Sequence, residues 1–119
     1  MAAINTYRDL LVWQKAMNLV TDIYKSSQQY PSLEIYGLTS QMRRSAVSIP
    51  SNIAEGYGRR STGDYKRFLQ VATGSLFELQ TQIEISFNLG YIRNSEFESL
   101  FEKTKELDRM LSSLINKIK

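Results

Sequence analysis

The chain contains no cysteine and no histidine, and it has only two prolines and six glycines in 119 residues. The absence of cysteine excludes disulfides, zinc–thiolate sites and thiol nucleophiles. The absence of histidine removes the commonest general base and the commonest ligand of transition metals. Because proline and glycine mark turns, their scarcity favours long uninterrupted helices over a β fold with many turns.

Length and composition indicate one globular domain, which we place over residues 1–119. Apolar residues make up 42% of the chain and charged residues 23%, which is ordinary for a folded protein. The first residues do not combine a basic segment with an apolar core, as a signal peptide would. No apolar run approaches the roughly 20 residues that span a bilayer. We therefore expect a soluble, cytoplasmic protein without a membrane partner.

The positive charge of the chain is concentrated in one segment. The net charge is +3, but residues 43–67 alone carry six basic and two acidic side chains, a net of +4. The remaining residues carry nine basic and ten acidic side chains, a net of −1. Such a basic segment, with Tyr57 and Tyr65 nearby for base stacking, is typical of a nucleic-acid-binding surface. The predicted binding residues are Arg43, Arg44, Arg59, Arg60, Lys66 and Arg67.

Apolar residues that recur at spacings of three and four predict four helices. The first covers about residues 9–29, and Pro31 ends it because proline disfavours a helical residue before it. The second begins between residues 32 and 39 and runs to about residue 57. Its expected inward residues are Leu38, Met42, Ala46, Ile49 and Ile53. The first helix has two adjacent apolar stripes, which together predict one wide apolar face: Leu10, Trp13, Met17, Val20 and Tyr24 in one, and Val12, Ala16, Leu19 and Ile23 in the other.

The third helix is expected to start at residue 61 or 62, where Ser61 and Asp64 resemble a capping box, and to end at Gly90. The fourth is expected to open with a capping box of Ser95 and Glu98. The expected core stripe of the third helix is Tyr65, Leu69, Ala72, Leu76, Leu79 and Ile83. The expected core stripe of the fourth helix is Phe97, Phe101, Thr104, Leu107, Leu111, Leu114 and Ile118. Short loops make successive helices antiparallel, so the predicted fold is all-α: an up-down-up-down antiparallel four-helix bundle.

Pro50 lies inside the apolar stripe of the second helix. In a regular helix it costs about 3 kcal/mol, through a lost hydrogen bond and a clash with the carbonyl of Ala46. We expect a kinked but continuous helix, and the alternative is a break with Ser48 as the new cap. The following Gly56-Tyr57-Gly58 is interpreted as a helix end with a tight turn. It follows a helix and lacks the lysine of a phosphate-binding loop.

Two further helix faces suggest contacts beyond one chain. The second helix carries a polar seam that we expect to point away from the core: Gln41, Ser45, Ser48, Asn52, Glu55 and Arg59. Opposite its core stripe, the third helix carries Val71, Gly74, Glu78, Thr81, Ile85 and Leu89. A glycine at position 74 weakens the helix by up to about 1 kcal/mol relative to alanine, which is tolerable if another helix packs there. Solvated faces are the alternative. The predicted oligomer interface is Ser48, Asn52, Glu55, Val71, Gly74, Glu78 and Ile85.

Residues 36–56, YGLTSQMRRSAVSIPSNIAEG, closely resemble the signature of the bacterial 23S ribosomal RNA intervening-sequence proteins. Residues 9–15 are similar to the opening motif of that family. Its third-helix motifs are matched by Arg59, Tyr65, Phe68 and Leu69 and by the Gly74–Leu79 segment, and its last turn by Gly90-Tyr91. The resemblance implies a four-helix bundle that assembles into a homopentameric ring. The family is also similar to the accessory protein of diversity-generating retroelements, a pentameric barrel that binds nucleic acid and a reverse transcriptase.

We therefore expect a non-enzymatic homo-oligomer that binds nucleic acid, RNA or single-stranded DNA, with avidity from several copies. The alternative is a scaffold ring with a protein partner, in which the arginines pair with acids such as Glu55 and Asp64 at subunit interfaces. Nuclease chemistry without histidine usually needs clustered carboxylates and a divalent metal, whereas the acids here are spread over separate helices. The resemblance supplies no catalytic residues, and we expect no enzymatic activity, cofactor or metal.

Overall fold

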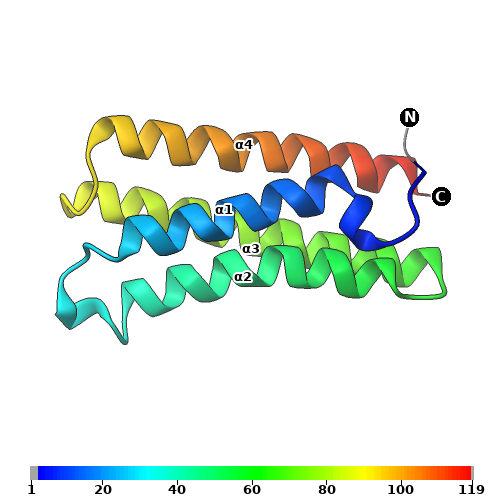
Figure 1. Ribbon diagram of the computed structural model, residues 1–119, viewed down its shortest axis with the longest axis horizontal. Helices are drawn as coiled ribbons and strands as arrows, with labels where there is room; N and C mark the ends of the chain where they lie inside the picture. Colours follow the sequence, from blue (N-terminus) through cyan, green and yellow to red (C-terminus); the bar gives the residue numbers. More distant parts are fainter. Residues whose placement is uncertain (1–2, 119) are drawn as a thin grey trace.

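The computed structural model describes residues 3–118, and every regular element within them is helical. The chain forms four long helices, with one short 3-10 turn before the first helix and another between the first and the second (Figure 1). The elements are η1 (Tyr7–Asp9), α1 (Leu11–Ser27), η2 (Ser32–Glu34), α2 (Leu38–Tyr57), α3 (Thr62–Asn88) and α4 (Asn94–Lys117). The four helices lie within a residue or two of their predicted starting points, except that α1 begins only after η1.

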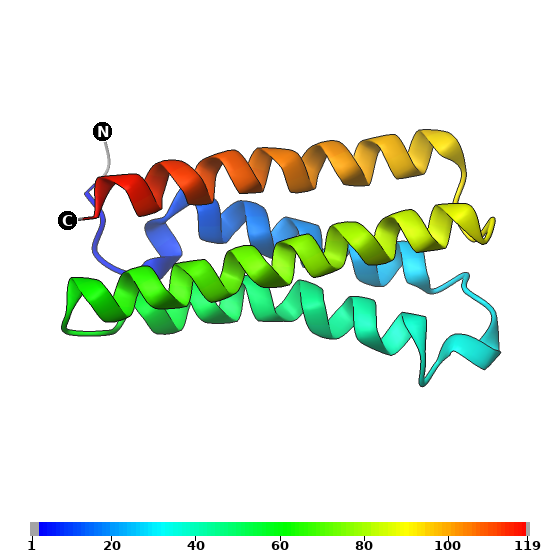
Figure 2. The same cartoon turned by 180° about the vertical axis from the view of Figure 1, so that it is seen from behind.

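The four helices form an antiparallel bundle measuring 43 × 27 × 20 Å. Helices that follow one another in the sequence pack against each other, and the first helix α1 also packs against the last helix α4. The contact between α2 and α3 is the most extensive. Both ends of the chain and the α2–α3 loop lie at one end of the bundle, and the other two connections lie at the opposite end (Figures 1 and 2). This arrangement confirms the predicted four-helix bundle.

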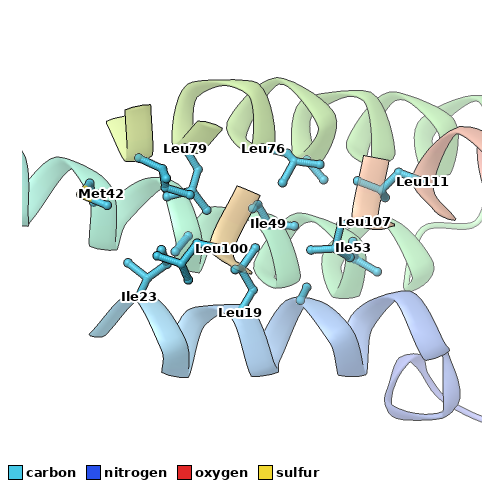
Figure 3. Close-up of a cluster of buried hydrophobic side chains, with 14 of the residues drawn as sticks. Leu19, Ile23, Met42, Ile49, Ile53, Leu76, Leu79, Leu100, Leu107 and Leu111 are labelled. Carbon is cyan, nitrogen blue, oxygen red and sulfur yellow. The ribbon is translucent and has the colours of Figure 1, made fainter. Parts of the chain in front are cut away.

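Side chains from all four helices meet in one apolar core (Figure 3). In α1 the buried stripe is the one that contains Leu19 and Ile23, whereas Met17 and Tyr24 of the other stripe remain 42% and 41% exposed. Leu10, Trp13 and Val20 of that stripe still pack against the core, so the expected wide apolar face is only partly turned inward. In α4 the core includes Leu100, which the predicted stripe omits. The fully buried large side chains are Leu19, Ile23, Met42, Ile49, Ile53, Leu69, Leu76, Leu79, Ile83, Leu107 and Leu111.

The ends of α3 follow the predicted signals. The Ser61 hydroxyl accepts a hydrogen bond from the backbone N–H of Asp64 at 3.0 Å, which caps the first turn. At the other end Gly90 has a φ of 79°, and its N–H donates to the carbonyl of Phe87. The N–H of Tyr91 donates to the carbonyl of Ser86, which completes a Schellman motif. Glycine is needed here because this backbone conformation is strained for other residues.

The predicted capping box of the fourth helix is wrong. The helix begins at Asn94 with Arg93 as its N-cap, and no side chain caps it there. Because Ser95 lies inside the first turn, its backbone is already helical and it cannot serve as the cap. The side chain of Asn94 instead donates to the carboxylate of Glu98 at 3.2 Å.

The second helix continues through its proline. It is helical from Leu38 to Tyr57, which confirms the prediction that Pro50 does not end it. Pro50 is buried, and the amide of Asn52 donates to the carbonyl of Ser48 at 2.8 Å and to its hydroxyl at 2.9 Å. Side-chain hydrogen bonds therefore reinforce the helical turn that contains the proline.

Candidate nucleic-acid interface

The helices α2 and α3 come very close together at Gly56, just before the loop that joins them. A Cβ atom at this position would lie 2.7 Å from the Cβ of Phe68 and 3.2 Å from the Cδ1 of Tyr65. Real Cβ atoms do not approach another carbon within 3.0 Å. Gly56 therefore allows the two helices to meet and fixes the loop that carries the basic residues.

An aromatic and basic cluster forms around this contact. The guanidinium carbon of Arg59 lies 4.7 Å from the ring centroid of Phe68, and that of Arg67 lies 5.8 Å from the same centroid. Both distances are within the range of cation–π attraction. Tyr57 and Tyr65 meet edge to face, with ring centroids 6.0 Å apart. We call this group the hairpin cluster: Tyr57, Arg59, Arg60, Tyr65, Lys66, Arg67 and Phe68.

The hairpin cluster has an excess of positive charge. Arg59 pairs with Glu55 at 3.7 Å and Arg67 with Asp64 at 3.2 Å, and both pairs are largely exposed. Exposed pairs contribute at most about 1 kcal/mol and are screened by salt. Arg60 and Lys66 make no ion pair with any residue from 3 to 118. The cluster therefore offers two unpaired cations and two weakly held arginines to an anion.

The Tyr65 phenol of the hairpin cluster is neutral at physiological pH. Burial raises the pKa of the Tyr65 hydroxyl, and the neighbouring Tyr57 raises it further. A neutral phenol in this basic cluster can donate a hydrogen bond and present its ring edge. This combination suits a phosphate backbone with adjacent unstacked bases.

Arg43 has a different role from the loop arginines, because its side chain binds the end of α1. Its Nε donates to the hydroxyl of Ser27 at 2.9 Å, and its Nη2 reaches the carbonyl of Tyr24 at 3.4 Å. The guanidinium also lies 4.6 Å from the centroid of the Tyr24 ring. A cation is favourable at the C-terminus of a helix. Arg43 therefore holds α1 and α2 together within the chain.

Arg44 is exposed and makes no ion pair within the described part of the chain. It lies about 20 Å along α2 from the loop that carries Arg59, at 1.5 Å per residue. The six basic residues predicted from the sequence thus divide into three groups. Four lie in the hairpin cluster, Arg43 is engaged with α1, and Arg44 stands apart.

The middle of the polar seam of α2 faces α3, so the expectation that the seam points away from the core is wrong there, whereas Gln41, Glu55 and Arg59 at its two ends are exposed. Ser45 is buried and its hydroxyl donates to the Glu78 carboxylate at 2.8 Å. The hydroxyls of Ser48 and Ser75 are 2.9 Å apart. These seam residues reach α3 because α2 packs against α1 on one side and against α3 on the other. A groove of about 410 Å³ remains along this contact, lined by Gln41, Arg44, Ser45, Ser48, Ser75, Glu78 and Gln82.

The predicted second face of α3 lies on the outside of the bundle. Val71 and Ile85 are 48% and 42% exposed, and Glu78 is exposed apart from its contact with Ser45. A Cβ atom on Gly74 would have no heavy atom within 4 Å. No contact within the described chain therefore requires glycine at this position. Of the other predicted interface residues, Glu55 is exposed and Ser48 and Asn52 are half-buried.

The roles of Gly56 and Phe68 do not follow from the sequence pattern, which indicates only a helix end at Gly56 and a family motif at Phe68. Phe68 lies three residues after Tyr65 and directly after Arg67, a spacing that could have indicated its place beside the basic residues. Within residues 3–118, no three acidic side chains gather in a metal-binding arrangement. Among the helices described, none has the length and apolar character required to cross a membrane.

Comparison with known proteins supports the fold and gives the family. A crystal structure from the S23 ribosomal protein family of Bacteroides thetaiotaomicron, of a protein with unknown function, has a TM-score of 0.83 to this chain. It is 23% identical, and the match covers 90% of this chain and 96% of that one, so the likeness shows a shared fold. No curated protein matches the chain. The family model described as 23S rRNA-intervening sequence protein matches residues 8–113, and the chain belongs to this family.

Proposed function

We propose that the protein is a non-enzymatic, self-associating protein of the cytoplasm that binds RNA, or single-stranded DNA, through the hairpin cluster. The observation that carries this proposal is the set of four cations in the hairpin cluster: Arg59 and Arg67 lie over the Phe68 ring, and Arg60 and Lys66 lack an acidic partner among the described residues. The family description names a ribosomal RNA, which favours RNA as the ligand. The chain has neither histidine nor cysteine, which favours binding over catalysis.

Binding would be mainly electrostatic. Lysine and arginine side chains displace the counterions of the phosphates, and this gain is independent of base sequence. One chain with about four phosphate contacts binds weakly, whereas linked copies bind the same strand with a much higher avidity. Self-association is supported by the exposed apolar residues of α3 and by Gly74, which no contact within the described residues explains. The family resemblance favours a homopentamer.

The test is the binding of a labelled single-stranded RNA, followed by fluorescence anisotropy over a series of salt concentrations. Four phosphate contacts predict a straight line of log affinity against log salt with a slope of about −3, at roughly −0.7 per contact. Base composition should have little effect. If neither RNA nor single-stranded DNA binds at about 50 mM salt, where such contacts are strongest, the proposal fails and a scaffold with a protein partner replaces it.

Self-association is tested by light scattering on the same preparation. A pentamer has five times the chain mass of 13.7 kDa. A particle with the mass of one chain at micromolar concentration would exclude the self-associating part of the proposal.

A further inference from the structure

The outer side of the α1–α2 pair carries an apolar surface that no described residue covers. Two adjoining hollows of about 360 and 520 Å³ share Val47 along their border. Four apolar side chains here are 40–57% exposed, namely Met17, Tyr24, Ile35 and Val47, and exposed apolar side chains gathered in one place usually mark an interaction site. We call this surface the α1–α2 groove: Trp13, Met17, Tyr24, Ile35, Val47 and Pro50.

The outer side of α3 carries a second apolar surface of a different shape. We define the α3 stripe as Val71, Gly74, Glu78, Ile85 and Leu89. It extends over about 27 Å of helix, at 1.5 Å per residue. Because the Cβ position of Gly74 is open, another helix can approach the α3 backbone closely at the middle of the stripe. The stripe is a projecting helix face, and the α1–α2 groove is a hollow between two helices.

The charges of the two surfaces are complementary. The α2 helix carries Arg43 and Arg44 but no acidic residue before Glu55, and neither hollow of the groove is lined by an acid. Residues 68–92, which include the whole α3 stripe, contain two glutamates and no lysine or arginine. If the α3 stripes of two copies packed on each other, the two Glu78 side chains would lie close together. If the α3 stripe of one copy packed on the α1–α2 groove of another, Glu78 would instead lie near Arg43 and Arg44 of that copy. Like charges in contact are unfavourable, and opposite charges select the correct partner.

We propose that the α1–α2 groove receives the α3 stripe of a second copy of this chain, so that copies associate head to tail. The proposal rests on the self-association put forward above and specifies its two surfaces. The groove and the stripe lie on either side of α2, which packs against α1 on one side and α3 on the other. Each contact therefore joins two different surfaces, and repeated contacts of this kind close into a ring only where the rotation between copies adds up to a full turn. The residues of the hairpin cluster belong to neither surface and stay free in every copy.

Two variants test this pairing, since each blocks one surface and leaves the other intact. Val47→Glu places an acid in the groove, and Gly74→Leu places a bulky side chain on the stripe where the structure has open space. Each variant alone should have the mass of one 13.7 kDa chain by light scattering. An equimolar mixture should form a dimer containing one copy of each. In that dimer the stripe of Val47→Glu occupies the groove of Gly74→Leu, and no surface remains for a third chain.

Matched controls separate this result from unfolding. Ser112→Glu adds the same charge at an exposed position of α4, and Gly63→Leu adds the same side chain at another open glycine of α3. Both should retain the parent mass, and all four variants should retain the helical circular dichroism of the parent. If the parent is an oligomer but the mixture contains no mixed dimer, the head-to-tail pairing is wrong and self-association stands. If the parent has the mass of one chain, self-association itself is wrong.

Discussion

Gly56 and Phe68 are in such close contact that no side chain fits between them, since a Cβ atom on Gly56 would lie 2.7 Å from the Cβ of Phe68. Replacing Gly56 with alanine should force α2 and α3 apart at the hairpin cluster. We expect a loss of about 1–3 kcal/mol in the free energy of unfolding, as for other overpacked sites. Urea unfolding followed by circular dichroism measures this loss.

Gly58→Ala is the matched control, because the nearest atom to its Cβ would be the carbonyl oxygen of Glu55 at 3.6 Å, an ordinary contact. We expect the free energy of unfolding of this variant to lie within about 0.5 kcal/mol of that of the parent. Equal losses for the two variants would mean that glycine is needed for the loop conformation and not for the approach of the helices.

The sequence alone predicted the four helices and most of the core, because periodicity records which residues face inward. It treated the two apolar stripes of α1 as one wide face, since the choice between them depends on where α2 and α4 lie. The stripe that contains Leu19 is buried, and Met17 of the other is 42% exposed. Periodicity within one helix does not reveal the position of its neighbours.

The polar seam of α2 shows the same limit for the site. Small polar residues suggest solvent or a second chain, but Ser45 and Ser48 find hydrogen-bond partners on α3. Likewise, the basic segment of the sequence appeared as one group, although folding directs Arg43 toward α1. Charge counts locate a basic region, and only the fold tells which cations are already engaged.

Arg43→Gln should destabilise the fold without changing nucleic-acid binding. The variant loses a hydrogen bond to Ser27 and the contact with the Tyr24 ring, which together are worth about 1–3 kcal/mol. We expect a lower urea midpoint and an unchanged salt dependence of RNA affinity. A changed slope with unchanged stability would instead place Arg43 among the residues that contact phosphate.

Stability should fall at high pH because three tyrosines ionise less readily in the folded chain. The hydrogen bond from the Tyr91 hydroxyl to the Glu34 carboxylate raises the pKa of Tyr91 above its ordinary value of 10.0, and burial raises the pKa of Tyr30 and Tyr65. A raised pKa gives stability that is complete below pH 10 and is lost as the pH rises through the folded value. We expect the free energy of unfolding to decline above pH 10.

Tyr91→Phe separates this effect from the titration of lysines. The variant lacks one of the three phenols, so its stability should decline less steeply above pH 10 than that of the parent. Urea unfolding at a series of pH values measures both curves. Parallel curves would show that the Tyr91–Glu34 hydrogen bond does not hold the proton in the folded state.

Arg60→Gln combined with Lys66→Gln should weaken RNA binding without destabilising the chain. Neither side chain makes an ion pair within residues 3–118, so their replacement removes no contact of this kind from the fold. If each contacts one phosphate, the slope of log affinity against log salt becomes less steep by about 1.4, at roughly 0.7 per contact. The control is Lys103→Gln together with Lys105→Gln, which removes the same charge from α4 and should leave the slope unchanged. These two lysines lie far from the hairpin cluster in sequence, and Lys103 pairs with Asp22 on α1. Equal reductions in both double variants would show that RNA responds only to net charge, and the hairpin cluster would then not be the binding site.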